Sequence, residues 1–249
     1  MNQIFGLIGF PLGHSFSKGY FDKKFRSEGI KNSIYKNFPL ENIEQFTDLI
    51  KSNPRLAGLN VTIPYKESVI PYLNEIDREA AEIGAVNTIK FVQDFGKVKL
   101  IGYNTDIVGF KKSLFNFWNN TGENAMVLGS GGASKAILHV LNSLKMKIVV
   151  VSRNKSGKGF IKYNELTPDL IKDNKLIINT TPLGMYPHTE NAPDIPYEYI
   201  SNDHYLFDLI YNPGETKFLK MGKMKGAYIL NGLNMLVEQA EKSWEIWNS

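Results

Sequence analysis

Short apolar runs alternate with longer amphipathic stretches along the whole chain, and this alternation is typical of an α/β layer structure. In the first hundred residues the apolar runs predict strands at 4–9, 33–38, 56–62, 86–92 and 97–103. Between them, helical periodicity covers 17–28, 41–52 and 66–83, the last interrupted at Pro71. We expect these elements to form a parallel sheet with helices packed against it.

A second series of the same kind follows. Apolar runs predict strands at 125–129, 147–152, 175–181 and 205–210, with a helix over 133–144. A helix that begins at Asn104 or Asp106 and runs to about 119 would join the two halves. The last helix, about 234–247, carries an apolar stripe typical of core packing. We expect two domains, 1–104 with 234–249 and 105–233.

Composition narrows the class of protein. The 249 residues are 43% hydrophobic and 22% charged, which is enough apolar material for a substantial core. No apolar run reaches the ~18 residues of a membrane span, and the first residues do not resemble a secretion signal, so we expect a cytoplasmic protein. The net charge of +4 is spread along the chain, which favours an anionic small molecule over nucleic acid.

Several kinds of chemistry are excluded by residue type. The chain has no cysteine, so disulfides, thiolate nucleophiles and cysteine-bound zinc are absent. Its four histidines are scattered without metal-ligand spacing, and we assign no metal.

A glycine-rich segment, GSGGASKA at 129–136, lies where a predicted strand ends and a predicted helix begins. Gly129 allows a tight turn and Gly131 allows the backbone to approach a pyrophosphate, which the helix N-terminus attracts. The same pattern also fits a ligand-free turn between a strand and a helix. In this context we predict a dinucleotide site formed by Gly129, Ser130, Gly131, Gly132 and Ala133.

The end of the next strand indicates which dinucleotide. NAD-specific folds place an acidic residue there, on the ribose hydroxyls. This chain instead has Ser152, Arg153, Asn154 and Lys155, whose two cations suit a ribose 2′-phosphate. A solvated basic turn is the alternative. We predict NADP, and the missing acid also disfavours an S-adenosylmethionine-dependent methyltransferase.

In the first half, polar residues gather beside predicted strand ends in the segments PLGHSFS (11–17), NVTIPYK (60–66), GAVNT (84–88) and GYNTD (102–106). Their neutral donors and acceptors suit a polyhydroxylated ligand better than a metal. Lys66 and Asp106 form the one pair here with acid–base potential. Taken singly, Lys66 also fits a solvated helix residue and Asp106 a helix N-terminal charge.

These strings resemble the shikimate dehydrogenase family, as do INTTPLGM (178–185), LIYNP (209–213) followed by Thr216, and MLVEQA (235–240). The resemblance implies a substrate domain, a Rossmann-like NADP domain with a parallel sheet, and a C-terminal helix that returns to the first domain. It implies NADPH-dependent reduction of 3-dehydroshikimate to shikimate by a monomer or homodimer.

The resemblance also implies roles for individual residues. Lys66 would be the proton donor and acceptor, with Asp106 as its partner. Leu209 and Gly232 would line the nicotinamide pocket. The substrate would contact Ser15, Ser17, Asn60, Thr62, Lys66, Asn87, Asp106, Tyr211 and Gln239.

The chain departs from the family pattern in a few places. No helix is evident between 152 and the next candidate strand at 159–166, although a parallel crossover usually needs about a dozen residues. Phe16, Lys18 and Asn234 stand where the family usually has lysine, proline and glycine. Two alternative functions remain: an NAD-preferring quinate/shikimate dehydrogenase, which the missing acid disfavours, and a non-catalytic sensor of a shikimate-like ligand, which has little need for both Lys66 and Asp106.

Overall fold

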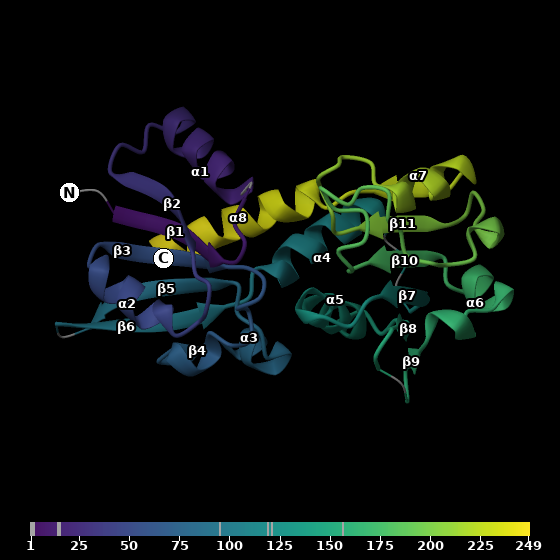
Figure 1. Cartoon of the computed structure of the whole chain (residues 1–249), viewed down its shortest axis with the longest axis horizontal. Coiled ribbons are helices and arrows are strands. Elements are labelled where there is room, and N and C mark those ends of the chain that lie inside the picture. Colours follow the sequence, from purple (N-terminus) through teal and green to yellow (C-terminus); the bar gives the residue numbers. More distant parts are fainter. Residues whose placement is uncertain (1–2, 14–15, 95, 119, 121, 156) are drawn as a thin grey trace. The chain divides into compact units, whose positions relative to one another are not determined.

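The computed structural model describes residues 3–13, 16–94, 96–118, 120, 122–155 and 157–249. The chain divides into two compact units, residues 1–106 with 237–249 (unit 1) and residues 107–236 (unit 2). Each unit contains one six-stranded sheet, called sheet A in unit 1 and sheet B in unit 2 (Figure 1).

Sheet A has the strand order β2-β1-β3-β5-β6-β4. The elements of unit 1 are β1 (Gln3–Gly9), α1 (Phe16–Ser27), β2 (Ser33–Pro39), α2 (Gln45–Ser52), β3 (Leu56–Val61), the short 3₁₀ helix η1 (Ile70–Tyr72), β4 (Glu75–Ile76), α3 (Arg78–Ile83), β5 (Thr88–Asp94) and β6 (Lys97–Tyr103). α4 (Asp106–Phe117) begins at the last residue of the first segment of unit 1, and most of α8 (Leu233–Asn248) belongs to unit 1.

Sheet A is mixed, so the expectation of a fully parallel first sheet was wrong. β5 runs antiparallel to both β3 and β6. Only two residues separate Asp94 from Lys97, which face each other across the β5–β6 pair. So short a connection makes a hairpin, because a parallel pair needs a long crossover. The reversal brings the start of β5 beside the ends of β3 and β6.

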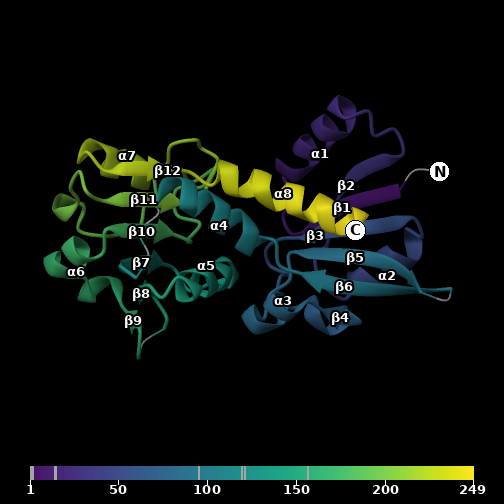
Figure 2. The same cartoon turned by 180° about the vertical axis from the view of Figure 1, so that it is seen from behind.

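The alternation of side chains along β1 builds a core on each face of sheet A. Ile4 and Ile8 pack in a cluster with Phe46 of α2, whereas Phe5 and Leu7 face an aromatic cluster supplied by α1 and α8. The C-terminal helix thus returns to the first unit, as expected, and Figure 2 shows it from the opposite side.

Gly58 makes room for the α8 helix. A Cβ built on Gly58 would lie 2.3 Å from the Trp247 indole, whose Nε1 donates to the Ile89 carbonyl at 3.0 Å. Any side chain at position 58 would push this end of the helix away from sheet A.

The single helix predicted over 66–83 was wrong. The chain instead forms a turn, then η1, the two-residue strand β4 beside β6, and finally α3. Asp77 caps α3 by accepting from the Glu79 N–H at 3.0 Å, and Gly84 ends it at a φ of 67°. These local stop and start signals override a helical periodicity that is already broken by proline.

Sheet B has the strand order β12-β11-β10-β7-β8-β9, and all its strand pairs are parallel. Its elements are β7 (Asn124–Leu128), α5 (Gly132–Ser143), β8 (Lys147–Val151), β9 (Phe160–Ile161), η2 (Tyr163–Glu165), α6 (Pro168–Asp173), β10 (Leu176–Asn179), η3 (Tyr197–Tyr199), β11 (Tyr205–Asp208), α7 (Lys217–Met224) and β12 (Tyr228–Leu230). Strand β10 is buried along its whole length, as both-face coverage of a Rossmann-like sheet requires.

The short segment after β8 reaches a parallel partner without a described helix. β9 pairs with Val150 and Val151, and the Val150 N–H donates to the Gly159 carbonyl at 3.0 Å. Gly157 and Gly159 have φ values of 112° and 83°, which glycine adopts readily and which let the chain turn back tightly. A two-residue edge strand therefore replaces the longer crossover expected from general rules.

Within the described part of the chain, none of the helices combines the length and the apolar character that crossing a bilayer demands.

Candidate active site

The polar segments of unit 1 meet at one edge of sheet A. Asn60 near the end of β3 pairs with Thr88 at the start of β5, and Thr88 pairs with Tyr103 at the end of β6. Lys66 lies in the turn after β3, fixed by its carbonyl, which accepts from the Val86 N–H at 2.7 Å. The antiparallel placement of β5 is what brings GAVNT between NVTIPYK and GYNTD.

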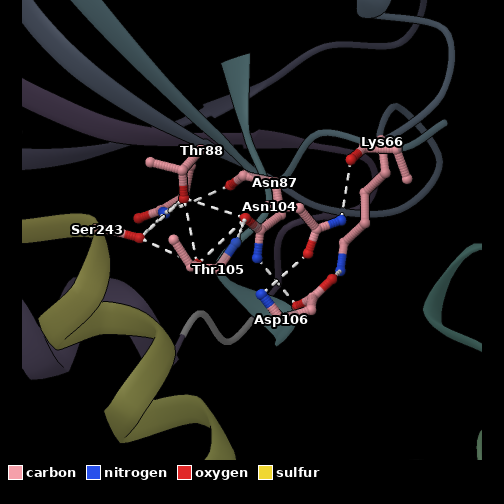
Figure 3. A network of polar contacts seen from close by, with 9 residues as sticks. Lys66, Asn87, Thr88, Asn104, Thr105, Asp106 and Ser243 are labelled. Atoms are coloured by element: carbon pink, nitrogen blue, oxygen red, sulfur yellow. Dashed lines mark hydrogen bonds and ion pairs between the residues drawn. The ribbon is translucent and has the colours of Figure 1, made fainter. Parts of the chain in front are cut away.

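Lys66 and Asp106 form an ion pair at this edge, next to Asn87 (Figure 3). Lys66 Nζ donates to Asp106 Oδ2 at 2.7 Å. The carboxylate side chain is only 4% exposed, whereas the lysine side chain is 16% exposed. An ammonium has three donors, so the lysine can serve the aspartate and still offer N–H groups to a ligand.

Asn87 holds Asp106 in place. Its Nδ2 donates to Asp106 Oδ1 at 3.0 Å, while its Oδ1 accepts from the Thr105 N–H at 2.7 Å. The amide is thereby oriented, because the oxygen is already committed to a backbone donor. The Asp106 N–H donates to Asn104 Oδ1 at 3.1 Å, so the NTD segment and Asn87 brace each other.

A chain of neutral polar groups continues from this pair toward α1. Thr88 Oγ1 lies 2.9 Å from Ser243 Oγ of α8, and Asn60 Nδ2 donates to the same serine at 2.9 Å. The Tyr35 hydroxyl donates to Asn60 Oδ1 at 2.8 Å, and the Ser17 side chain hydrogen-bonds that hydroxyl. Burial raises the pKa of Tyr35, which therefore acts as a neutral donor.

The structure places the predicted substrate residues unequally. It joins Ser17, Asn60, Lys66, Asn87 and Asp106 in one hydrogen-bonded network. The Thr88 hydroxyl links its two parts by donating to Asn87 Oδ1 at 3.1 Å. Thr62 and Gln239 are half-buried in unit 1, and the Gln239 carbonyl accepts from Ser243 Oγ at 2.9 Å. Tyr211 belongs to unit 2, and Ser15 lies outside the described residues.

Sequence reasoning missed five members of the network, one of which is Tyr35 of β2, whose hydroxyl donates to Asn60. Thr88, Asn104 and Thr105 stand inside the quoted motifs GAVNT and GYNTD, so their positions offered a signal that was not used. Ser243 lies in the apolar stripe of the last helix, and only the packing of α8 on sheet A reveals that its hydroxyl bridges β3 and β5.

In unit 2 the glycine-rich turn has the features that a pyrophosphate requires. Gly129 has a φ of 106°, and a Cβ there would lie 2.7 Å from Thr180 Oγ1. A Cβ on Gly131, the N-cap of α5, would meet no atom within 4 Å, and no side chain caps this helix. An open, uncapped helix N-terminus behind a tight glycine turn fits the phosphates of a dinucleotide.

The turn after β8 contains one buried residue, Ser152, followed by three exposed ones. Ser152 is 3% exposed, lies 2.8 Å from Ser130 Oγ, and accepts from the Lys155 N–H at 3.1 Å. Arg153, Asn154 and Lys155 are exposed. Ser152 therefore shapes the turn and ties it to the glycine-rich segment, while the next three residues are available to a ligand. These residues fit a ribose 2′-phosphate.

Leu209 and Gly232 lie against each other in unit 2. A Cβ built on Gly232 would lie 2.0 Å from the Leu209 carbonyl oxygen, so only glycine fits. The Gly232 N–H donates to the Ile210 carbonyl at 3.0 Å. The two residues predicted to line the nicotinamide pocket are thus brought together at the carboxyl ends of β11 and β12.

Next to Leu209, Asp208 is fully buried, and its burial raises the pKa of its carboxyl to about 6 from the ordinary 3.8. Hydrogen bonds from Thr216, Ile210 and Asn179 oppose this rise because they favour the charged form. The described residues place no cation at ion-pair distance from it. Tyr197, whose pKa is raised by its own burial and by the Asp208 charge, stays protonated over the same range.

This carboxyl predicts a pH-dependent stability. Between the two pKa values the folded chain binds more protons than the unfolded chain, so the stability from this group is fully present below about pH 4 and is lost as the pH rises through about 6. Denaturant titrations measure the free energy of unfolding of the wild type and of Asp208→Asn. The wild-type value minus the variant value should fall by about 2 kcal/mol between pH ~4.5 and ~7.5. An equal difference at both pH values would contradict the raised pKa.

Comparison with known proteins gives the family. Residues 7–89 match the model of the shikimate dehydrogenase substrate binding domain. A shikimate dehydrogenase (NADP(+)) of Clostridium beijerinckii is 43% identical over 98% of this chain and 92% of its own. The crystal structure of shikimate dehydrogenase from Aquifex aeolicus is 36% identical, with a TM-score of 0.88 over 99% of this chain and 92% of that one.

A third comparison adds bound ligands in a relative. Shikimate 5-dehydrogenase from Thermus thermophilus, solved in complex with NADP(H) and shikimate, is 28% identical, with a TM-score of 0.84 over 98% of this chain and 93% of that one. Because relatives named shikimate dehydrogenase (NADP(+)) are 40% and 43% identical over 98% of this chain, the chain belongs to the shikimate dehydrogenase family.

Proposed function

We propose that the protein is a shikimate dehydrogenase that catalyses the reversible, NADPH-dependent reduction of 3-dehydroshikimate to shikimate. The observation that carries the proposal is the ion pair of Lys66 and Asp106, braced by Asn87, in a chain whose relatives are named for this reaction. Unit 1 is proposed to bind the substrate and unit 2 to bind NADP. We also propose a cytoplasmic enzyme that acts as a monomer or homodimer.

Bound NADPH supplies the hydride, and the protein must supply the proton. Lys66 Nζ is proposed to donate a proton to the ketone oxygen in the reduction and to accept it from the hydroxyl in the reverse direction. Asp106 stabilises the charged lysine and limits its rotation, since their atoms lie 2.7 Å apart. Its own position is fixed by Asn87, which makes the pair a preorganised acid–base unit.

The polyhydroxylated substrate is proposed to bind along the neutral side of the same network. Ser15, Ser17, Asn60, Thr62, Asn87, Tyr211 and Gln239 are proposed to contact its carboxylate and hydroxyl groups. Hydroxyl and amide side chains suit such a ligand because each both donates and accepts hydrogen bonds. Support comes from Ser17, Asn60 and Asn87, which share a network with the proposed acid–base pair.

On the cofactor side, Gly129 to Ala133 are proposed to hold the pyrophosphate at the start of α5. Arg153, Asn154 and Lys155 are proposed to bind the 2′-phosphate, with Ser152 fixing their turn from within. Leu209 and Gly232 are proposed to line the nicotinamide pocket. The open N-terminus of α5 and the exposed cations support this assignment.

Asp106→Asn should lower kcat about tenfold with little change in folding, because a charge-assisted hydrogen bond is roughly twice as strong as a neutral one. An amide at 106 also presents one N–H₂ group, which must face either Lys66 or the Asn87 N–H₂ group. One of the two contacts is therefore lost. Steady-state kinetics across a full pH range would measure the effect, and a profile identical to that of the wild type would remove the carboxylate from the proton-transfer step.

Initial rates of shikimate oxidation with NADP test the proposed function as a whole. A sensor that binds the same ligand would saturate with shikimate without reducing NADP.

A further inference from the structure

Asp208 is a buried charge that the proposed chemistry does not use. It ends β11 at the carboxyl edge of sheet B and is 0% exposed. Its carboxylate accepts from three neutral donors, Asn179 Nδ2 at 3.1 Å, the Ile210 N–H at 3.0 Å and Thr216 Oγ1 at 2.6 Å. Burying a carboxylate without a cation costs free energy, and these three hydrogen bonds offset part of that cost.

Two of these donors belong to the segment that follows β11. Ile210 lies near the start and Thr216 at the end of the loop 209–216, and Thr216 also caps α7 by accepting from the Leu219 N–H at 3.4 Å. The carboxylate thus closes this loop from inside and fixes the start of the next helix. Leu209, assigned to the nicotinamide pocket, is the residue between Asp208 and Ile210.

The third donor, Asn179, links the Asp208 carboxylate to the segment that follows the neighbouring strand β10. Asn179 ends β10 and faces Asp208 in the strand register. With its Nδ2 held by Asp208, the Asn179 Oδ1 accepts from Thr181 Oγ1 at 2.7 Å and from the Thr181 N–H at 3.0 Å. Thr181 Oγ1 in turn accepts from the Leu183 N–H at 3.3 Å. The segment 180–183 is therefore fixed by the same carboxylate.

Both segments touch residues of the proposed cofactor site. A Cβ on Gly129 would lie 2.9 Å from Thr181 Cγ2, so the glycine turn packs directly on the segment held by Asn179. Gly232 packs against the Leu209 carbonyl, and the Leu209 N–H donates to the Asn179 carbonyl at 3.0 Å. Asp208 and Asn179 thus lie between the pyrophosphate turn and the nicotinamide residues.

We propose that Asp208 is a positioning residue for the dinucleotide: its carboxylate, through Asn179, Ile210 and Thr216, sets the geometry of the two loops on which the pyrophosphate turn and Leu209 rest. This inference rests on the proposed function, because it presumes that this edge of sheet B binds NADP. Asp208 does not touch the cofactor in this account and acts through the loops.

The test compares Asp208→Ala with Asp208→Asn. Asparagine keeps an oxygen for Asn179 and Ile210 and can donate to the Thr216 hydroxyl, which also rotates to accept, whereas alanine leaves three buried donors without an acceptor. We expect Asp208→Ala to raise the KM for NADP and the Kd for NADPH by about tenfold or more, and Asp208→Asn to restore both to within about threefold of wild type. The KM for shikimate should rise less than the KM for NADP in Asp208→Ala, because Tyr211 is the one proposed substrate residue in the loop 209–216 and most of the others lie in unit 1.

Matched controls separate positioning from general damage. Asp203→Ala removes a partly exposed aspartate that pairs with Lys175 before the start of β11, and it should leave both cofactor constants unchanged. Thr181→Val keeps the shape of the side chain and cuts only the hydroxyl link from Asn179 to Leu183, so it should raise the NADPH Kd by about threefold even if Asp208→Ala does not fold.

NADPH binding is measured by fluorescence titration without substrate, so the inference can be judged apart from catalysis. An NADPH Kd unchanged in both Asp208→Ala and Thr181→Val would overturn it, as would an equal rise in the KM values for NADP and shikimate. If the wild type binds NADPH but does not oxidise shikimate, the proposed function fails while the positioning role is still decided by the Kd values.

Discussion

Lys66→Ala is expected to lower kcat by roughly 10²–10⁴-fold, the usual contribution of a positioned proton-transfer group. The KM for shikimate should change by only a few-fold, because the neutral network from Asn87 to Ser17 remains to bind the substrate. Removing the lysine also leaves Asp106 buried without its cation, so the variant's folding must be checked by circular dichroism and thermal denaturation. Steady-state kinetics at neutral pH then measure the loss.

Lys99→Ala is a suitable control. Lys99 pairs with Glu75 on the same sheet, away from the network, and its loss should leave kcat unchanged. A folded Lys66→Ala protein that kept more than about a third of wild-type kcat would show that another group transfers the proton.

Arg153→Ala is expected to weaken the binding of NADP by about 10–150-fold, because a charge-assisted hydrogen bond to a phosphate contributes roughly 1.5–3 kcal/mol. NAD lacks the 2′-phosphate and should bind almost as before. The change should appear in the KM for NADP with kcat nearly preserved, which is the pattern of lost ground-state binding. Arg153 is exposed, and its turn is held by the Ser152 hydroxyl, so the substitution removes a ligand contact without opening the core.

Lys147→Ala provides the matched control, since Lys147 is an exposed cation at the opposite end of the same strand. It should leave the KM for both cofactors unchanged. Equal weakening of NADP and NAD by Arg153→Ala would remove the arginine from the 2′-phosphate site.

Where local signals agreed with tertiary packing, sequence patterns predicted the fold well. The strand Lys97–Tyr103 was predicted with its observed ends, and the helix after Asn104 begins at Asp106 as one of the two expected starts. The prediction of a single helix over 66–83 was wrong because the helical periodicity there competes with Pro71, with the pairing of β4 to β6 and with the Asp77 cap. Short elements such as α6 and β12 carry too few residues to show a period.

The candidate site was predictable only in part, for a similar reason. Lys66 and Asp106 are 40 residues apart, and motif strings indicated that they belong together, but their 2.7 Å contact depends on the antiparallel position of β5 between β3 and β6. The sequence patterns did not predict Ser243 or Asp208 as functional residues. Ser243 owes its place to partners on strands that are distant in the sequence. Asp208 directly precedes LIYNP, but neither its burial nor its contact with Asn179 of β10 can be read from that string.

We propose that this protein oxidises shikimate with NADP. Initial rates measured with shikimate and quinate, each combined with NADP and with NAD, test it in one experiment. We expect the pair of shikimate and NADP to have the highest kcat/KM, because two exposed cations and no acid follow β8. Equal or better turnover with NAD, a preference for quinate, or no turnover with any pair would contradict it.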